Sequence, residues 1–577
     1  MTRPKWLASV ASVMGAGLLT AALAACGGPA TPSSAAVPQS ITLVGGVQTE
    51  PNWWFPIVPV SVCSTSNFGI SMLYHPLLWI SRHDTVNFSR SIASSIAVTN
   101  NDTVYTIHLK PSWHWSNGSP VTAADVVYAW DIVNASAQSN APWLNCGAGI
   151  GGIPSDWQSV TALNSSTVQV VSKKPVNPVW FEINGIGQLI PIPKQLWDHT
   201  SNMTQELKWI NTVGNRPFSK YFALTDGPYK LTKFVSNGYW TFAANPNYSG
   251  HVASIKHITF EYETSTSNEF AQLRRGNFSM AQLGPSLYRS RHELTGYQYR
   301  TPGYSFGINY VQPNLSPQTP GIGNLFSKLY IRQALQMGID QPVIAQKLYL
   351  GFATPEWSPV PSQPPNAFYD KALTDPYPYN ISAAKTLLEN HGWRMVNGVM
   401  ERNGQKLSFP FLYMSGSQTD TNIAQLLQQD WAKEGVQVTL RSEPFNQVIA
   451  TASASTPSKW VMAWWGAGWF YGPDYYPTGG GLYASGGSAN TGGYASSTMN
   501  ALIAKTYAPG TPAQEQNRLD AYQAYVAQQL PVLFLPEYIG YGMPTPYMVV
   551  KPWLHGVVKW YSPIEGNQYN RWTISGS

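Results

Sequence analysis

The chain has 577 residues, of which 11% are charged and 43% hydrophobic, and its formal net charge is +6. A chain of this length can hold several domains, each with its own core. The low charged share excludes a disordered chain, and the small positive balance argues against a nucleic-acid partner. Aromatic residues are abundant, with 23 Trp and 32 Tyr, which suits a protein that holds an apolar or ring-bearing ligand.

The first 26 residues have the pattern of an export signal, with a basic start and an apolar stretch at 7–23. The stretch ends in LAAC, which resembles a bacterial lipobox and implies cleavage before Cys26 and a lipid on its sulfur. The alternative is an ordinary secretory signal in which Cys26 is incidental. Residues 27–40 are predicted to form a flexible tether. No later segment offers the roughly 18 consecutive apolar residues of a spanning helix, so we expect membrane contact through the lipid anchor only.

Two further cysteines, Cys63 and Cys146, remain once Cys26 is set aside. Cysteines of an exported protein usually pair, so we expect a disulfide between them. Two buried free thiols are the alternative. We expect no zinc site on this pair, because no suitable histidine lies near either cysteine in the sequence.

The most informative stretch, residues 91–133, predicts a strand, a tight turn and a helix. Residues 104–109 alternate in the period-two pattern of a half-buried strand. Asn117-Gly118 is a turn dipeptide, because both residues tolerate positive φ. Thr122 and Asp125 then form a T-x-x-D capping box before an apolar run. The cap accounts for Asp125, so we expect a structural rather than a catalytic role.

This order resembles the segment shared by the family 5 extracellular solute-binding proteins of ABC importers, of the oligopeptide- and dipeptide-binding type. The residues that match the family pattern are Tyr105, Ile107, Leu109, Lys110, Trp115, Gly118, Val121, Thr122, Ala123, Asp125 and Val126. Further matches follow in the family's order at residues 74–78, 226–231, 245–248, 331–340, 380–393 and 518–535. Resemblance over nearly the whole mature chain is a stronger indication than any single motif.

The resemblance implies an α/β fold of the periplasmic-binding-protein type, with a two-lobed cleft, a discontinuous first domain and an extra second domain. Two hinge strands would let the lobes close over a ligand. Carried over to this chain, domain I would hold residues 41–75, 186–300 and 527–577, domain II residues 76–185, and domain III residues 301–526.

Within domain III, residues 422–444 are predicted to form an αβ unit. Its helix is expected at 423–434 and its strand at 436–441, with Gly435 between them.

The stretch from Trp464 to Pro477, WWGAGWFYGPDYYP, is the strongest candidate for a ligand site. Its many rings and three glycines suit an aromatic-walled loop where backbone approaches a ligand. The family carries G-W-x-A-D-Y-x-D-P here, and its tryptophan lines the side-chain pocket while its first aspartate grips a peptide's α-amino group. Trp465 matches that tryptophan and Asp474 the later aspartate. The first aspartate falls on Gly468 or Tyr471, so this chain departs from the family at the amino anchor.

Asp474 or Glu50 could replace the missing anchor, or aromatic faces such as that of Trp469 could hold a cationic or ring-shaped ligand. The resemblance also places residues 50–54 at the loop leading into the cleft, and Asn309 where the family has a cleft-facing asparagine. The alternative is that the aromatic residues simply pack between the lobes. The expected ligand-binding residues are Glu50, Trp53, Trp54, Asn309, Trp465, Trp469, Tyr471 and Asp474.

Enzyme motifs are weak in this sequence. Ser305 lies in a G-x-S-x-G pattern, but strand-like residues follow it where a nucleophile elbow needs a helix. Residues 147–152 match G-x-G-x-x-G, but Pro154 blocks the helix that should follow. We therefore expect no catalysis, no cofactor and no metal. The rival class is a secreted carbohydrate-active hydrolase that uses the aromatic-rich cleft, which would need two carboxylates about 5–10 Å apart.

The sequence predicts a monomeric substrate-binding lipoprotein of an ABC importer. It would sit at the extracytoplasmic face of the bacterial cell membrane or in the periplasm, capture a peptide or a similar small solute between two lobes, and deliver it to the permease subunits. Family members bind peptides mainly, but some take nickel complexes, oligosaccharides or opines, so the resemblance leaves the ligand open.

Overall fold

The computed structural model describes residues 40–44, 50–81, 85–472, 475–540, 545–557 and 568–575. The expected signal segment, Cys26 and the tether up to residue 39 lie outside these ranges, as does Asp474. No helix within the described ranges is both long and apolar enough to cross a membrane.

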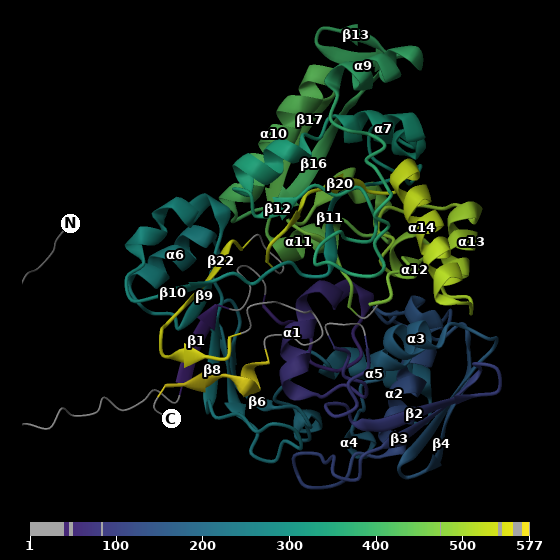
Figure 1. Cartoon of the computed structure of the whole chain (residues 1–577), viewed down its shortest axis with the longest axis vertical. Coiled ribbons are helices and arrows are strands. Elements are labelled where there is room, and N and C mark those ends of the chain that lie inside the picture. The colour runs from purple at the N-terminus through teal and green to yellow at the C-terminus, as the bar shows by residue number, and fades with distance from the viewer. Residues whose placement is uncertain are drawn as a thin grey trace, which may run out of the picture. The chain divides into compact units, whose positions relative to one another are not determined.

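The first sheet takes its seven strands from separate stretches of the chain, in the order β10-β22-β9-β1-β8-β7-β6 (Figure 1). β1 pairs in parallel with β8 and β9, while β6, β7 and β8 form an antiparallel meander. Because β1 opens the described chain and β22 lies near its end, this sheet forms only when distant segments meet. Its strands are β1 (Ser40–Val44), β6 (Tyr229–Val235), β7 (Tyr239–Ala244), β8 (His257–Glu261), β9 (Met280–Leu283), β10 (Gln298–Arg300) and β22 (Tyr547–Val550). The helices that accompany it are α1 (Cys63–Leu73) and α6 (Thr266–Arg274).

A second, antiparallel sheet has the order β2-β3-β5-β4 and packs against α2. The predicted strand, turn and helix are confirmed: β3 spans Val104–Leu109, Gly118 has φ 87°, and α2 begins directly after Thr122. The elements of this part are β2 (Ala93–Thr99), β3, α2 (Ala123–Ser136), β4 (Trp157–Asn164), β5 (Thr167–Ser172), α3 (Pro178–Trp180), α4 (Lys194–Trp197) and α5 (Met203–Val213).

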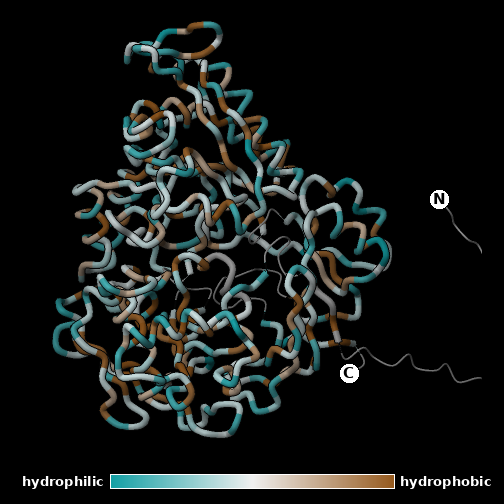
Figure 2. Tube along the Cα trace, turned by 180° about the vertical axis from the view of Figure 1, so that it is seen from behind, coloured by the Kyte–Doolittle hydropathy of each residue, from teal (hydrophilic) through white to brown (hydrophobic). Residues whose placement is uncertain are grey.

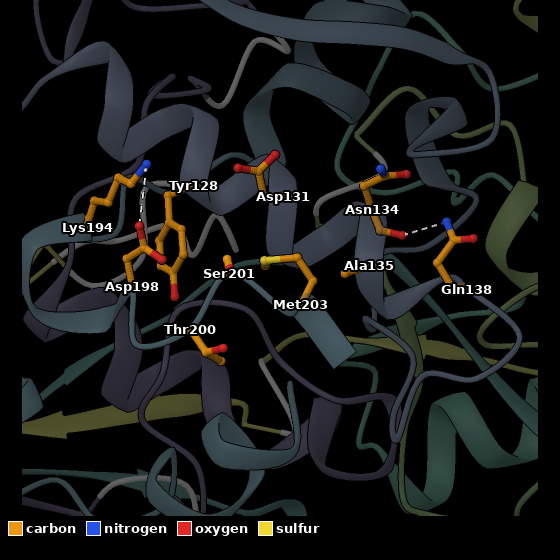
Figure 3. Close-up of a pocket in the computed structure, with 10 residues that line it drawn as sticks. All are labelled: Tyr128, Asp131, Asn134, Ala135, Gln138, Lys194, Asp198, Thr200, Ser201 and Met203. Carbon is orange, nitrogen blue, oxygen red and sulfur yellow. Dashed lines mark hydrogen bonds and ion pairs between the residues drawn. The ribbon is translucent and has the colours of Figure 1, made fainter. Parts of the chain in front are cut away.

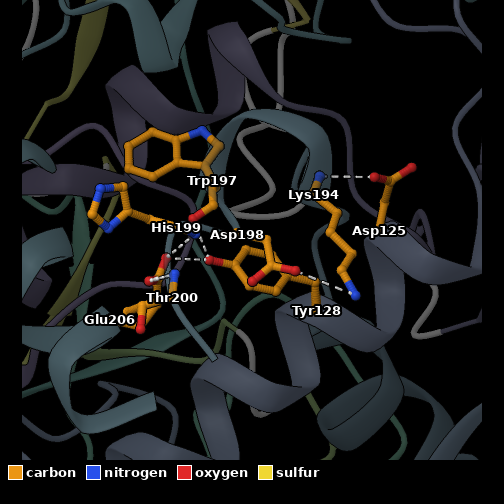
Figure 4. A network of polar contacts seen from close by, with 8 residues as sticks. All are labelled: Asp125, Tyr128, Lys194, Trp197, Asp198, His199, Thr200 and Glu206. Atoms are coloured by element: carbon orange, nitrogen blue, oxygen red, sulfur yellow. Dashed lines mark hydrogen bonds and ion pairs between the residues drawn. The ribbon is translucent and has the colours of Figure 1, made fainter. Parts of the chain in front are cut away.

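Asp125 joins the start of α2 to a neighbouring segment (Figure 4). Its Oδ2 accepts hydrogen bonds from the backbone N–H and the hydroxyl of Thr122, at 2.8 and 3.0 Å, and its Oδ1 accepts the backbone N–H of Lys194 at 2.9 Å. On the next turn of α2, the hydroxyl of Tyr128 donates to the buried carboxylate of Glu206 at 2.7 Å. The structural role expected for Asp125 is confirmed, and its carboxylate also ties the segment at Lys194 to the helix.

Replacing Asp125 by Ala is expected to lower the free energy of unfolding by about 1–3 kcal/mol, because the change removes a cap and leaves buried donors unpaired. Urea denaturation followed by circular dichroism measures the change. Asp131→Ala, on the same helix but outside the cap, is the matched control and should cost less. Equal losses for the two variants would contradict this account of the cap.

The third sheet has the order β17-β16-β18-β11-β19, and β20 also pairs with β11 (Figure 1). Its strands are β11 (Gly307–Pro313), β16 (Ser408–Met414), β17 (Gln437–Glu443), β18 (Met462–Trp464), β19 (Gly468–Phe470) and β20 (Leu533–Leu535). The longer helices around it are α7 (Leu329–Met337), α9 (Ile381–Asn390), α10 (Gln418–Glu434), α13 (Ser497–Thr506) and α14 (Pro512–Gln529). Shorter elements are α8 (Gln341–Val343), β12 (Ala353–Thr354), β13 (Arg394–Val396), β14 (Val399–Arg402), β15 (Gln405–Lys406), α11 (Phe445–Thr451), α12 (Gly480–Tyr483), β21 (Glu537–Tyr538), β23 (Leu554–His555) and β24 (Thr573–Ile574).

The predicted αβ unit is present as α10 followed by β17, with Gly435 in the left-handed region at φ 91°. The prediction placed the start of the helix too late. Its first turn is polar and is fixed by Ser417, whose side chain accepts the backbone N–H of Asp420 at 3.2 Å. Apolar periodicity cannot find such a turn, because the turn contains no apolar repeat.

The core of this sheet is built from large side chains of β16 and α10. Trp431 is completely buried, its ring centre lies 6.0 Å from that of Phe411, and its indole N–H donates to the backbone of Leu335 at 2.9 Å. In Figure 2 apolar stretches recur along the strands of this region, and polar stretches are frequent in the outer turns. The sheet that carries the candidate ligand segment is therefore a well-packed support.

Candidate functional site

The aromatic segment 464–472 lies against the central strand β11. β19 pairs antiparallel with β11, with Asn309 opposite Gly468. A Cβ at Gly468 would collide with the backbone oxygen of Ile308, and Gly466 has φ 79°. The glycines are therefore needed for the close approach to β11, as an aromatic-walled loop requires.

The rings of this segment differ in how freely they could meet a ligand. Trp465 is 9% exposed, its indole N–H donates to the backbone of Gly468 at 3.2 Å, and its ring lies edge-on to Tyr310 at 5.5 Å. Trp469 is half-buried. Tyr471 is fully buried, and its hydroxyl donates to the backbone oxygen of Pro359. Trp469 thus presents the most exposed of the three predicted rings.

Asn309 is fully buried and bonded to several elements. Its Oδ1 accepts the indole N–H of Trp464 at 3.0 Å, and its Nδ2 donates to the backbone of Pro536 at 3.1 Å and to the Tyr349 hydroxyl at 3.4 Å. These bonds position the wall behind the aromatic segment. Direct contact of Asn309 with a ligand stays a prediction.

Glu50 and Trp54 contact the first sheet, whereas Trp53 lies edge-on to Trp143, in the loop that follows α2. The Glu50 carboxylate accepts the backbone N–H of Asn237 at 2.6 Å, in the turn between β6 and β7. Trp53 donates to the backbone of Ile57 at 3.0 Å, and Trp54 is 1% exposed and packs on rings of β6 and β7. Packing of this kind is sufficient to explain the two tryptophans, and their contact with a ligand stays a prediction.

The structure joins Cys63 and Cys146 in a disulfide, with their Cα atoms 5.8 Å apart. Backbone hydrogen bonds from Val60 to Leu144 and from Cys146 to Val58 run beside it. The bridge ties the start of α1 to the loop that follows α2.

Three buried carboxyl groups near the aromatic segment were not predicted from the sequence. Asp420 is fully buried, and burial raises its pKa to about 7, against a smaller lowering by a hydrogen bond from the Ser417 side chain. Burial also raises the pKa of Glu356 to about 8, although Ser362 donates to that carboxylate, and holds the pKa of Glu537 well above its usual range. The one sequence signal was the S-x-x-D pattern at Ser417, which indicates a helix cap and not a site.

Ser305 does not have the surroundings of a nucleophile. Its side chain is fully buried and donates to the backbone of Gly540 at 2.9 Å, and β11 follows it where a nucleophile elbow would continue as a helix. The G-x-S-x-G match is therefore incidental.

A separate open depression of about 480 Å³ lies beside α2 (Figure 3). Lys194 and Asp198 form an ion pair at 3.5 Å on its wall. Most of the residues that line it have polar side chains, Tyr128 supplies the single ring, and none of the predicted ligand residues is among them. This depression lacks the aromatic walls expected of the ligand site.

The mixed α/β structure, with sheets assembled from distant chain segments, has the fold of the two-lobed solute-binding proteins. Residues 87–487 match the family of bacterial extracellular solute-binding proteins, family 5, and the chain belongs to this family. The family and the fold class expected from the sequence are confirmed.

Among curated proteins, the chain is 25% identical over 402 residues to protein XP55 of Streptomyces lividans and 21% identical over 398 residues to the oligopeptide-binding protein AppA of Bacillus subtilis. The matches cover 69% and 66% of this chain, and 66% of each relative's own length. Among solved structures, AppA in complex with a nonapeptide superposes with a TM-score of 0.79 at 19% identity, covering 93% of this chain and all of AppA. NikZ of Campylobacter jejuni with Ni(L-His) gives 0.75 at 19% identity, covering 93% of this chain and 99% of NikZ.

Proposed function

We propose that this protein is the substrate-binding lipoprotein of an ABC importer. It captures a peptide or a similar small solute between its two lobes and delivers it to the permease. It makes and breaks no covalent bond. The observation that carries the proposal is the aromatic segment 464–472, held by its glycines against β11 in a family 5 fold. The family membership gives no support to a carbohydrate-active hydrolase.

Contacts between distant parts of the fold support capture by closure. The side-chain amide of Asn184 donates to the backbone oxygen of Tyr476 at 2.8 Å and accepts its N–H at 2.9 Å. The backbone N–H of Ser286 donates to the Thr419 hydroxyl at 3.3 Å. With the domain boundaries expected from the sequence, these bonds join domains II and I to domain III, so hinge opening would break them.

The proposal includes export and anchoring. Residues 1–26 act as the signal, Cys26 carries the lipid, and the mature monomer stands at the extracytoplasmic face of the cell membrane, with a lipid-free form in the periplasm as the alternative. The partners are the permease subunits of the importer. No cofactor takes part.

A peptide is the ligand that we propose. AppA is described as oligopeptide-binding and has been solved with a nonapeptide, whereas NikZ holds a nickel–histidine complex on the same fold. Trp465, Trp469 and Tyr471 are proposed as the walls for peptide side chains. Rings bury large apolar areas and accept many side chains, which suits a carrier of mixed peptides.

Native mass spectrometry of the mature domain, purified from its own host and then denatured to release what it carries, tests the proposal. We expect a distribution of short peptides. A single non-peptide species would contradict the peptide assignment while leaving the transport role intact. A protein that is purified without a bound molecule and that binds none of a mixture of synthetic tri- to nonapeptides would contradict peptide capture itself.

A further inference from the structure

The chain passes between the first and the third sheet twice. It leaves β10 of the first sheet and enters β11 of the third through residues 301–306, and it returns from β20 towards β22 through residues 536–540. The two segments are bonded to each other: the backbone N–H of Gly540 donates to the oxygen of Gly303 at 3.0 Å, and the Ser305 hydroxyl donates to the oxygen of Gly540 at 2.9 Å. Any movement of one sheet relative to the other must bend these segments, so they form the hinge of the two-lobed fold.

Two carboxyl groups lie at this hinge, on neighbouring strands. Glu537 belongs to β21, which pairs antiparallel with β12, and it stands opposite Thr354, two positions before Glu356. The hydroxyl of Tyr304, on the other hinge segment, shares a hydrogen bond with that of Thr354 at 2.8 Å. Burial raises the pKa of Tyr304, the bond to Thr354 lowers it, and both acids raise it again. The two acids therefore flank one tyrosine at the hinge.

Both carboxyl groups are shielded from water, since each residue is only 1% exposed. Burial raises the pKa of Glu356 to about 8, although the backbone N–H of Ser362 donates to its Oε1 at 3.0 Å. Burial also holds the pKa of Glu537 well above its usual range, and Glu356 raises it further. Two like charges in a buried place cannot both form at low cost, so the pair keeps protons that exposed carboxyl groups would lose.

No basic side chain compensates this pair. Lys347, on the nearby turn at 344–348, is exposed, and none of the ion pairs among the described residues includes Glu356 or Glu537. The titratable groups linked to the pair from the surrounding elements are Tyr304 on the hinge, Tyr349 after the turn, Tyr369 and Asp370 on the loop beyond Glu356, and Asp420 on α10. The charged groups on this side are thus acids, which add to the cost of ionising the pair.

We propose that Glu356 and Glu537 make the hinge respond to pH, so that the protonated pair favours closed lobes and the ionised pair favours opening. In this structure the lobes are in contact, through Asn184 with Tyr476 and Ser286 with Thr419, while both acids are buried. Bending at 536–540 moves β21 relative to β12 and lets water reach the carboxyl groups. Charged carboxylates gain far more from this hydration than neutral ones do.

The direction of the response follows from where the protons bind more tightly. Burial in the closed form raises the pKa of each acid relative to a hydrated, open form. Closure is therefore most favourable at low pH and weakens as the pH rises towards the pKa values of the closed form. The part of the inference that concerns ligand retention rests on the proposed function, whereas the opening of the hinge does not.

Small-angle X-ray scattering of the mature protein without ligand tests the hinge by itself. We expect the radius of gyration of the wild type to be larger at about pH 8 than at about pH 5. In Glu356→Gln and Glu537→Gln one acid of the pair no longer titrates, and both variants should expand much less over this range. Circular dichroism checks that each protein is folded at both pH values.

Calorimetric titration with one peptide that binds measures the effect on ligand retention. The affinity of the wild type should fall by about 10-fold or more between pH 5 and pH 8, because one proton released on opening changes the closing equilibrium tenfold per pH unit. The two Gln variants should lose most of this dependence. The ionisation of the peptide is the same in every titration, so the difference between the proteins reports on the pair.

Glu434→Gln is the matched control. Glu434 is also fully buried, and burial followed by Asp430 holds its pKa well above the usual range, but it lies at the end of α10 beside Gly338. This variant removes a buried acid away from the hinge. It should alter the pH dependence of stability and keep the wild-type response of the radius of gyration and of the affinity.

The outcomes separate the hinge from peptide capture. A wild type with the same radius of gyration at both pH values, or Gln variants at the hinge that expand as the wild type does, overturns the inference and leaves peptide capture standing. A Glu434→Gln variant that loses the response as well would show an effect of overall stability, which also overturns it. A wild type that binds no peptide overturns peptide capture, and the scattering result still decides the hinge.

Discussion

Asp420→Asn is expected to stabilise the ligand-free protein at about pH 8, by about 4 kcal/mol, and to change its stability little near pH 4. The pKa of Asp420 rises to about 7 because burial disfavours the charged form, against a smaller lowering by Ser417. An acid whose pKa is raised on folding binds its proton more tightly in the folded state. The free energy of unfolding therefore falls as the pH rises from the pKa of Asp420 in the unfolded chain to its pKa in the folded protein. The Asn side chain does not titrate, so the variant does not lose stability in this way.

Thermal and urea unfolding of the two proteins between about pH 4 and pH 8 measures the difference. Tyr349, whose pKa Asp420 influences, and Glu537, which influences the same tyrosine, are present in wild type and variant alike. Their contributions largely cancel in the comparison. Parallel stability curves for wild type and Asp420→Asn would show that Asp420 is not charged and unpaired in the folded protein at neutral pH.

Removing the disulfide with Cys63→Ser and Cys146→Ser is expected to lower the free energy of unfolding by about 4–5 kcal/mol. The two cysteines are separated by 83 positions in the sequence, so the bridge removes a large loop-closure entropy from the unfolded chain. Urea unfolding with and without a reducing agent measures the effect. Reduction should destabilise the wild type by a similar amount and leave the double variant unchanged. A double variant as stable as the oxidised wild type would contradict a stabilising role.

The pairing of β19 with β11 gives a physical reason for the glycine at position 468. The family's first aspartate would fall on Gly468 or Tyr471 in this chain, and a Cβ at Gly468 collides with β11. No side chain fits at Gly468 while β19 keeps this pairing.

Much of the local structure follows from short sequence patterns. The cap at Thr122 and Asp125, the turn at Gly118 and the helix end at Gly435 depend on neighbours along the chain, so propensity and spacing were enough to predict them. The order of many such matches along the chain also indicated the family, although no single match was specific. Local patterns survive in any fold that contains them, which is why they could be recognised in the sequence.

The tertiary structure decided which residues meet and which are left unpaired. The sequence could not place Trp54 in the packing around the first sheet, or give Asn309 its bonds to Trp464 and Pro536, because these partners lie more than a hundred positions away. It could not show that Asp420 is fully buried either, since an acid near a helix start has the same sequence pattern whether its carboxylate is exposed or buried. The sequence by itself determined the family, the local elements and the aromatic segment. Only the folded chain decided where charge is left uncompensated, because burial and the absence of a partner are properties of contacts between distant residues.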